Sequence, residues 1–443
     1  MQLLRGPISI VAVAFAMACS GGNGGSAPGS PSQHSSIVAD AAPTSCTSGS
    51  SSPSHRSKGF IPAPLPQGLT LPAGFVGSVI ARVPRARELV IAPNGDLFVA
   101  TEGTHVYIVP HADDAGGAGV PHVFWTHPDS DNGGDAPNAG IALSLRECAL
   151  YVAGNTSVWM IRYHPGEQVA QAVQKIASVR TGPVSPGTDG DIHQTTSLAL
   201  TQGSLYVSVG SSCNSCTEVD PTRAAVLRFS PTGGRYTIKA TRIRNAIALA
   251  VNPVTGHLWV GDAGQDDLPF GHPYEFADDL SAHTGRADYG WPECEEHHTA
   301  YRPGSNCSTT VAPLVELPAY STLIGATFYP RKQSGAYAFP APYRGGLFIT
   351  AHGSWHRTSA GAFGAIPQVA FVAMNDDRPV IAVDWHNPTV QWKTFFGGFQ
   401  ENDGVTRIGR PTGIAVGPAG SLFVSDDQTG NIYRIRPARS SRP

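Results

Sequence analysis

Gly95-Asp96-Leu97-Phe98-Val99 carries the pattern that decides the fold: a turn, then leucine, an aromatic residue and a β-branched residue. The same triplet returns at residues 150–152, 205–207, 258–260, 347–349 and 422–424. The six leucines are 53, 55, 53, 89 and 75 residues apart. Repetition of a β-rich unit at a nearly fixed period indicates a β-propeller, because one blade cannot bury both of its faces alone. We therefore predict an all-β fold, a six-bladed β-propeller.

The sequence around each triplet supports this prediction. A second strand-like run precedes several copies and ends in a turn, as Leu89–Ala92 does before Pro93. Short β-rich runs between Pro and Gly turns are typical of antiparallel strands. The alternative, a β-sandwich with accidental similarity, does not readily explain six copies of one triplet. The gap of 89 residues between the fourth and fifth copies predicts an insertion, which we expect at Tyr289–Pro318.

The first residues predict export. Arg5 precedes an apolar run from Ile8 to Met17, which is too short to span a bilayer. Ala16-Met17-Ala18-Cys19 resembles a bacterial lipobox, so we expect residues 1–18 to be a lipoprotein signal peptide and Cys19 to carry lipid. An ordinary secretory peptide is the alternative. The expected location is the cell envelope, with membrane attachment through the lipid alone; under the Gram-negative sorting rule, Ser20 indicates the outer membrane.

Composition divides the rest of the chain. Residues 19–58 are rich in Gly, Ser and Pro and predict a flexible tether. The propeller is expected over residues 59–437, followed by a short tail at 438–443. Charged residues make up only 14% of the chain and the net charge is −3, so there is no basic field for nucleic acid.

Seven cysteines fit an oxidising compartment. If Cys19 carries lipid, six remain for pairing. Cys213 and Cys216 are close in sequence, as are Cys294 and Cys307, and Cys46 with Cys148 is left by elimination. The Cys213-x-x-Cys216 motif is also compatible with half of a zinc site, although the chain has no second copy of it.

Several blocks, in order along nearly the whole domain, resemble the PQQ-dependent sugar dehydrogenases, and the sorbosone dehydrogenase-like branch most. The blocks are His193-Gln194, Leu205–Asn214, Arg244–Leu249, Asn252–Asp266, Asp288–Cys294, Tyr343–Ile349, His352–Arg357, Gly409–Gly413 and Val424–Asp427. The resemblance implies oxidation of a sugar, an aldose or a ketoaldehyde by hydride transfer to the quinone PQQ. It also implies a small-molecule sugar substrate and a soluble or membrane-bound electron acceptor.

The resemblance assigns roles to particular residues. His193 is implied as the general base, and histidine suits this role because its pKa lies near neutrality. Arg244 is implied to stabilise negative charge on the quinone oxygen. PQQ carries three carboxylates, which favour guanidinium partners. The implied cofactor-binding residues are Asn245, Arg410, Arg407, His352, Trp355 and Arg357.

The family also uses calcium to bind and polarise PQQ. The matching ligands are the backbone carbonyls of Gly264 and Gln265. Asp266, Glu275 and Asp288 lie nearby in sequence and offer the hard oxygen ligands that calcium prefers. Carboxylates of a loop that simply face water are the alternative.

The chain departs from the glucose dehydrogenases at two positions. Ser211 stands where those enzymes carry the aspartate that orients the catalytic histidine, and Asp189 or Asp191 is a candidate substitute. Their PQQ-binding lysine has no match, and His352 occupies that region. The run Glu295-Glu296-His297-His298 looks like a metal cluster, but we expect an exposed loop there.

Two other functions stay open on the sequence. A calcium-dependent propeller hydrolase of the lactonase type needs a central ring of carboxylates and amides, whereas the loops here are more basic. A non-enzymatic binding propeller that has lost its cofactor chemistry is compatible with the missing lysine and aspartate. The chain has no G-x-S-x-G motif and no phosphate-binding loop, which argues against an α/β-hydrolase or a P-loop NTPase.

Overall fold

The computed structural model describes residues 46, 59–115, 117–128, 137–186, 192–266, 268–358, 361 and 364–438, without the side chains of 137–139. The expected signal peptide, Cys19 and the tether (apart from Cys46) lie outside the described residues, as do Asp189 and Asp191. Within the described ranges, no helix is both long enough and apolar enough to cross a membrane.

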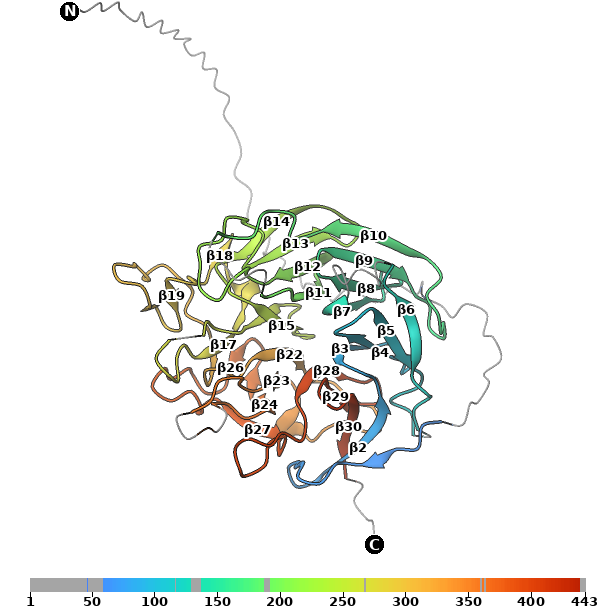
Figure 1. Ribbon diagram of the computed structural model, residues 1–443. Coiled ribbons are helices and arrows are strands. Elements are labelled where there is room, and N and C mark those ends of the chain that lie inside the picture. The colour runs from blue at the N-terminus through green and yellow to red at the C-terminus, as the bar shows by residue number, and fades with distance from the viewer. Residues whose placement is uncertain are drawn as a thin grey trace, which may run out of the picture. The chain divides into compact units, whose positions relative to one another are not determined.

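Six blades are arranged around a common centre, which confirms the six-bladed β-propeller (Figure 1). The second and third blades are joined into one nine-stranded sheet by the parallel pairing of their inner strands. The first blade contains β3 (Ala86–Ile91), β4 (Leu97–Thr101), β5 (His105–Val109) and β6 (His122–Thr126). The second contains β7 (Pro137–Ser144), β8 (Ala149–Gly154), β9 (Ser157–Arg162) and β10 (Val173–Ser178). The third contains β11 (Thr196–Thr201), β12 (Ser204–Val209), β13 (Ala225–Ser230) and β14 (Gly233–Thr241), extended by β18 (Ala287–Asp288).

The remaining blades follow the same order from the centre outward. The fourth contains β15 (Ala246–Val251), β16 (Leu258–Asp262), β17 (Glu275–Asp279) and β21 (Val315–Leu317). The fifth contains β22 (Leu323–Phe328), β23 (Leu347–Ala351), β24 (Gln368–Val372) and β27 (Trp392–Phe396). The sixth contains β28 (Pro411–Val416), β29 (Leu422–Asp426), β30 (Asn431–Pro437) and β2 (Phe75–Arg82), with β1 (Ala63–Pro64) at its edge.

The sixth blade closes the ring with strands from both ends of the domain. The N-terminal strand β2 pairs antiparallel with the C-terminal strand β30, with Val79 opposite Tyr433. Ile80 of β2 is fully buried and packs in one core with Leu97 of the first blade and Ile432 of the sixth. The first and last parts of the domain therefore depend on each other for burial.

The triplet repeat is the second strand of every blade, and its alternation explains the packing. In β4, Leu97 and Val99 pack toward the sixth blade, whereas Phe98 packs toward the second. In β29, Phe423 packs toward the first blade, in the core that contains Leu97. Successive side chains of a strand point to opposite faces, so each triplet contributes to two of the six cores between blades. A second strand buried on both faces needs apolar residues throughout, which is why the repeat is visible in the sequence.

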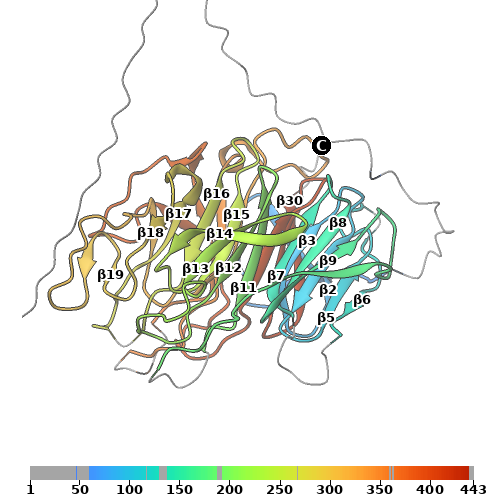
Figure 2. The same ribbon diagram turned by 90° about the horizontal axis from the view of Figure 1, so that it is seen from above.

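The expected insertion lies between β17 and β21. It contains a 3-10 turn (η1, Leu280–Ala282), β18 and a hairpin of β19 (Cys294–Glu295) and β20 (Thr299–Ala300). β19 lies at the outer rim of the ring in both ribbon views (Figure 2). A second small hairpin, β25 (Met374–Asn375) with β26 (Arg378–Pro379), and a 3-10 turn (η2, Ala341–Tyr343) belong to the fifth blade region.

All three expected disulfides are present: Cys46–Cys148, Cys213–Cys216 and Cys294–Cys307. The zinc alternative for Cys213 and Cys216 is wrong, because their sulfur atoms are bonded to each other. Cys148 lies in the turn between β7 and β8. β7 pairs in parallel with β11 near Thr196, close to His193, so this turn lies at the opposite end of the channel from His193.

We call the end that holds His193 the site end, and the other the far end. A cavity of about 540 Å³ opens along the inner strands toward the far end, and all six blades line it. Its walls are largely apolar, as at Leu143, Leu200 and Leu249. The polar residues singled out by the sequence are gathered at the site end instead.

Candidate active site

The connections of the strands gather the expected residues at the site end. The first two strands of a blade are antiparallel, so the residue before the first strand lies beside the residue after the second. His193 precedes β11 and Ser211 follows β12, while Arg244 and Asn245 precede β15. A Cβ atom on Gly210 would lie 2.6 Å from Asn245 Oδ1 and 2.7 Å from the His193 carbonyl oxygen. The third and fourth blades therefore meet here, and only a glycine fits between them.

Ser211 is the side chain that orients His193. His193 Nδ1 lies 2.7 Å from Ser211 Oγ, and the Ser211 hydroxyl donates to the Cys213 carbonyl oxygen at 2.7 Å. A hydroxyl group has one proton, so Ser211 Oγ must accept from the protonated Nδ1. This arrangement leaves Nε2 of the neutral ring as the basic nitrogen. The orienting partner that the sequence left open is thus Ser211 itself, at the position where the glucose dehydrogenases carry aspartate.

The surroundings of His193 keep the imidazole neutral. Burial, together with the charges of Arg244 and Arg180, lowers the pKa of His193 well below its ordinary value of 6.5. Arg180 also holds the backbone of this segment, since its guanidinium donates to the carbonyl oxygens of His193 and, at 2.6 Å, of Thr195. A neutral, fixed imidazole is ready to accept a proton at neutral pH.

Arg244 is only 3% exposed, and four polar contacts fix its guanidinium. Its Nε donates to the Asn214 carbonyl oxygen at 3.0 Å and its Nη2 to Asn214 Oδ1 at 2.8 Å. Its Nη1 donates to the Ala263 carbonyl oxygen at 3.1 Å, and Asp266 Oδ2 lies 3.2 Å from Nη2. The guanidinium is therefore a cation with one orientation, as charge stabilisation at a reacting centre requires.

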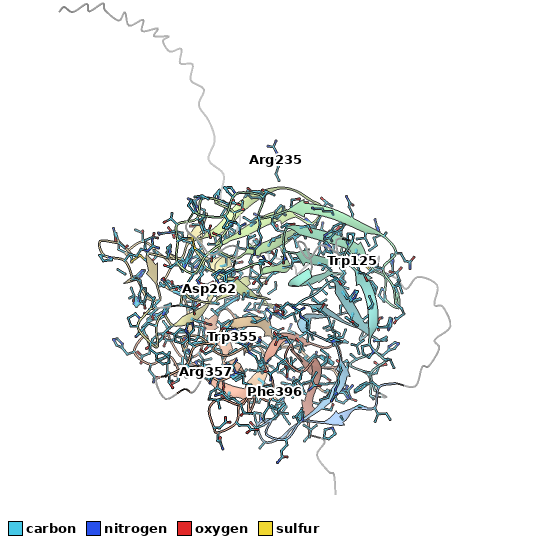
Figure 3. All side chains as sticks on the ribbon, in the orientation of Figure 1. Trp125, Arg235, Asp262, Trp355, Arg357 and Phe396 are labelled. Atoms are coloured by element: carbon cyan, nitrogen blue, oxygen red, sulfur yellow. A yellow bond between two sulfur atoms is a disulfide. The ribbon has the colours of Figure 1, made fainter. Side chains whose placement is uncertain are left out.

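A second group of cations comes from the fifth and sixth blades. Arg410 donates from Nε to the His352 carbonyl oxygen at 3.0 Å and from Nη2 to that of Gly353 at 2.8 Å. The Trp355 ring lies over the Arg410 guanidinium, with 4.2 Å between the ring centre and the guanidinium carbon. Trp355, which is labelled in Figure 3, is 73% exposed. Arg407 donates to the Ser354 carbonyl oxygen. Arg410, Arg407, His352 and Trp355 thus form one cluster.

The arginines at this cluster outnumber the two described carboxylates that act on them: Arg410, Arg407, Arg357 and Arg87 stand against Asp427 and Asp426. Burial and the charge of Arg407 lower the pKa of Arg410 to about 10, and burial and the charge of Arg357 lower that of Arg407. Burial alone would raise the pKa of Asp427, but a hydrogen bond from His352 and the charge of Arg87 bring it to about 2. Crowded, partly desolvated guanidinium groups form a site for an anion. An anionic cofactor with carboxylates fits this donor set.

Asp266 connects the loop of the cation cluster to Arg244. His356, in the same loop as Trp355, has its Nε2 2.8 Å from Asp266 Oδ1, while Asp266 Oδ2 contacts Arg244. The hydroxyl of Ser354 donates to the His356 carbonyl oxygen at 2.9 Å. The loops of the third to sixth blades therefore form one continuous polar surface at the site end.

The expected calcium ligands separate into two groups. Gly264 and Gln265 follow β16, and Gln265 donates from Nε2 to Glu295 Oε1 at 2.5 Å. Glu275 is buried, and its carboxylate accepts from the Leu323 backbone at 3.2 Å. Asp288 instead receives two hydrogen bonds from Arg242, at 2.7 and 2.9 Å. Asp266 is likewise engaged by Arg244 and His356, as described above.

Buried carboxyl groups surround the Gly264–Gln265 loop. Burial raises the pKa of Asp262 to about 7 and that of Glu295 to about 8, and raises that of Glu275 well above its ordinary value. Asp262, labelled in Figure 3, also accepts from the Asn245 backbone at 2.7 Å. Carbonyl and carboxyl oxygens are the ligand types that calcium prefers. Glu295, and not Asp288, is the carboxyl group that contacts the Gly264–Gln265 loop. Among the described residues, however, Asp262, Glu275 and Glu295 do not form a group close enough together to share one ion.

The expectation of an exposed loop at Glu295-Glu296-His297-His298 is wrong for the two glutamates. Glu295 is 6% exposed and Glu296 is buried with it. The Cys294–Cys307 disulfide and the β19–β20 hairpin fold this segment back, so that Glu295 reaches Gln265. Only His297 of the four is fully exposed.

Sequence reasoning missed Asn214, Asp262, Glu295, Asp427, Arg87 and Arg180. Asn214, Asp262 and Asp427 lie inside the blocks that carry the family resemblance, so a signal was present. The sequence around Arg87 does not indicate its role. Arg87 contacts Asp427 at 2.9 Å, and Asp427 lies at the other end of the domain in sequence.

The chain is similar in structure to several solved propellers. The Trichoderma reesei carbohydrate-active enzyme of family AA12 is 20% identical, with 87% of this chain and 100% of that one covered and a TM-score of 0.65. The PQQ domain of pyranose dehydrogenase from Coprinopsis cinerea, in its holo form, is 17% identical, with 84% and 98% covered and a TM-score of 0.67. The soluble aldose sugar dehydrogenase of Escherichia coli is 16% identical, with 82% and 100% covered and a TM-score of 0.55. These likenesses confirm the fold.

Comparison of the sequence with known proteins and family models assigns the chain to a family. An uncharacterized protein of Borreliella burgdorferi is 26% identical over 237 residues, which are 52% of this chain. The chain spans 56% of the length of that relative. The model of the TrAA12-like family matches residues 69–299 and 294–438, which together are most of the propeller. The chain therefore belongs to the TrAA12-like family, and the resemblance to the PQQ-dependent sugar dehydrogenases is confirmed.

Proposed function

We propose that this protein oxidises a sugar, an aldose or a ketoaldehyde, with PQQ as the hydride acceptor and calcium as its metal. One observation carries the proposal: Ser211 holds His193 with Nε2 free as a base, beside the fixed cation Arg244. The family supports it, since family AA12 and a PQQ domain of pyranose dehydrogenase are among the structural neighbours. The surplus of guanidinium groups at the site end supports an anionic cofactor.

His193 performs the proton transfer in this proposal. Its neutral Nε2 accepts the proton of the substrate hydroxyl as the hydrogen on the same carbon leaves as hydride. The contact from Nδ1 to Ser211 Oγ then stabilises the imidazolium in the same orientation. Bound PQQ supplies the two-electron acceptor, polarised by calcium. Arg244 places a positive charge where negative charge develops, and needs no rearrangement to do so.

The remaining site residues would hold and orient the cofactor and its metal. Arg410 and Arg407 would bind carboxylates of the cofactor, and the exposed Trp355 ring packed on Arg410 offers an apolar face beside them. The carbonyl oxygens of the Gly264–Gln265 loop, with the carboxyl group of Glu295 beside them, would hold calcium. Asn245, adjacent to His193 across Gly210, would contribute its amide.

Reconstitution tests the proposed function. The full chain is loaded with PQQ and calcium, and dye reduction is measured with a panel of aldoses and ketoaldehydes. We expect turnover that needs both additions and that falls about 100- to 10,000-fold in His193→Ala, because a positioned base contributes about that factor. A folded protein that binds no PQQ and reduces no dye would instead support the binding propeller. Lactone hydrolysis that needs calcium and no PQQ would support the hydrolase.

We also propose that the protein is exported and anchored by lipid at Cys19. The three disulfides support export, because such bonds persist in oxidising compartments. Metabolic labelling with a fatty acid, in the wild type and in Cys19→Ser, tests the anchor. The electron acceptor would be soluble or in the membrane.

A further inference from the structure

A small loop closed by the Cys213–Cys216 disulfide lies between the two proposed catalytic residues. We propose that this loop is the element that positions both of them, that Asn214 is its principal positioning residue, and that turnover depends on the intact disulfide. The inference rests on the proposed function for its catalytic readout, and on geometry alone for the rest.

Asn214 meets Arg244 with both of its carbonyl oxygens. The backbone oxygen accepts from Nε and the side-chain Oδ1 accepts from Nη2, at 3.0 and 2.8 Å. Two acceptors on one edge of a planar guanidinium fix both its position and its plane. An alanine at this position would keep the first contact and lose the second, leaving Asp266 Oδ2 as the acceptor for Nη2 and the guanidinium less firmly held.

Asn214 also fixes the segment that follows β16. Its Oδ1 accepts from the Asp266 backbone nitrogen at 2.8 Å and its Nδ2 donates to the Asp266 carbonyl oxygen at 3.0 Å. These contacts assign the amide, since Oδ1 meets two donors and Nδ2 meets an acceptor. Aspartate would keep the acceptors but would place an oxygen against the Asp266 carbonyl. Asparagine is therefore the residue type that satisfies all of these partners.

The same stretch positions His193. Ser211 accepts from the imidazole only because its own proton is donated to the Cys213 carbonyl oxygen. If that carbonyl turned away, the Ser211 hydroxyl could donate to Nδ1, and the proton of the imidazole would move to Nε2. A base with a protonated Nε2 cannot accept the substrate proton, so the orientation of Cys213 bears directly on the proposed chemistry.

The disulfide holds these carbonyls in place. It joins residues three apart, so the backbone that carries the Cys213 and Asn214 oxygens lies within the closed ring. Two further hydrogen bonds anchor this stretch: the Ser212 hydroxyl, just before the ring, donates to Glu218 at 2.8 Å, and the Trp291 indole donates to the Asn214 oxygen within the ring at 3.1 Å. Cys213 and Trp291 are buried and pack in one cluster. Opening the ring restores backbone freedom where one orientation is needed.

The test uses the full chain with PQQ and calcium. Asn214→Ala is expected to lower kcat about 100-fold with little change in KM, the effect of misplacing a reacting group by about 1 Å. Asn214→Asp, which keeps the contact to Nη2, is expected to recover part of that loss. Asn387→Ala, at an exposed loop asparagine, is the matched control and should match the wild type.

The disulfide is tested in the same way. The double variant Cys213→Ser, Cys216→Ser is expected to lose about tenfold or more in kcat. The loop still carries Asn214, but without the disulfide it no longer holds that residue in a single conformation. Cys46→Ser, Cys148→Ser removes the disulfide at the far end and should keep the wild-type kcat. Melting temperatures of all variants separate loss of positioning from loss of folding.

A readout without turnover keeps the inference separate from the proposed function. In ¹⁵N NMR of arginine-labelled protein, the Nη2–H of Arg244, which donates to Asn214 Oδ1 and is assigned with Arg244→Lys, should be protected from exchange and lose its protection in Asn214→Ala. If the wild type shows no turnover but this loss occurs, the positioning role stands and the dehydrogenase proposal fails. The inference would be overturned if Asn214→Ala and the double serine variant both kept the turnover and the Arg244 protection of the wild type.

Discussion

Ser211 gives His193 a neutral partner, and this has consequences for the pH range of activity. A carboxylate beside Nδ1 would stabilise the imidazolium and raise the pKa of His193. A hydroxyl that accepts from Nδ1 fixes the same tautomer without adding negative charge. Burial and two arginine charges can therefore lower the pKa of His193 well below 6.5.

A pH profile tests this at the residue scale. The base must be neutral, so activity is present above the pKa of His193 and is lost as the pH falls through it. We expect the acid limb of kcat/KM below pH 6.5 in the wild type, and a shift of that limb to higher pH in Ser211→Asp. Ser211→Ala should lower kcat without that shift. An acid limb that stays in place in Ser211→Asp would show that the titrating group is not His193.

Residue-scale roles could be predicted from sequence only where a motif carries them. The sequence blocks that resemble the family contain His193, Arg244, Asn245 and Arg410. The structure brings these four residues to the site end. Glu295 was expected in an exposed loop because its neighbours are charged. Its burial depends on a hairpin and a disulfide that bring it to Gln265, 30 residues away in sequence. No local pattern reports such a contact.

At the scale of elements, the second strand of each blade explains why the fold was visible in the sequence. Its leucine and β-branched residue pack on one neighbouring blade and its aromatic residue on the other, so every copy must keep the triplet. The outer strands instead expose part of their side chains to solvent, as β10 and β14 do, so they carry no such triplet. The insertion between β17 and β21 follows no repeat, and only its place, near Tyr289–Pro318, could be predicted.

Removal of one aromatic residue tests this account of the triplet. Phe98 is fully buried, with ring centres 4.9 Å from Phe124 and 4.8 Å from Tyr163. We expect Phe98→Ala to lower the free energy of unfolding by about 3–5 kcal/mol, the range for an aromatic residue cut from a packed core. Val254→Ala, at an exposed turn, should change it by less than about 0.5 kcal/mol. Urea denaturation measures both, and equal effects would contradict the account.

At the scale of the whole molecule, the ring is closed by hydrogen bonds between its two ends and by no covalent bond within the sixth blade. β2 supplies the outer strand of a blade whose other three strands come from the last residues of the domain. Such closure makes the first and sixth blades mutually dependent. This feature could not be read from the repeats, because β2 precedes the first triplet and has none of its own.

The closing strand offers a matched pair of substitutions. Ile80 is fully buried between the first and sixth blades, whereas Val76 on the same strand is 53% exposed. Ile80→Ala is expected to cost about 2–5 kcal/mol and to increase hydrogen exchange in β2 and β30. Val76→Ala should leave exchange in β30 at the wild-type rate. Equal exchange in the two variants would mean that β2 does not hold the ring closed.

The Cys46–Cys148 bond joins the N-terminal segment covalently to the far end of the propeller. Whatever is joined to the chain before Cys46, whether a lipid, an affinity tag or the surface of an electrode, takes its mechanical load at the turn between β7 and β8. That turn is at the far end, so a pull on the leader is borne by a covalent bond remote from His193 and Arg244. Immobilisation through the N-terminus would therefore leave the reactive end open to bulk solution and spare its loops from the tension.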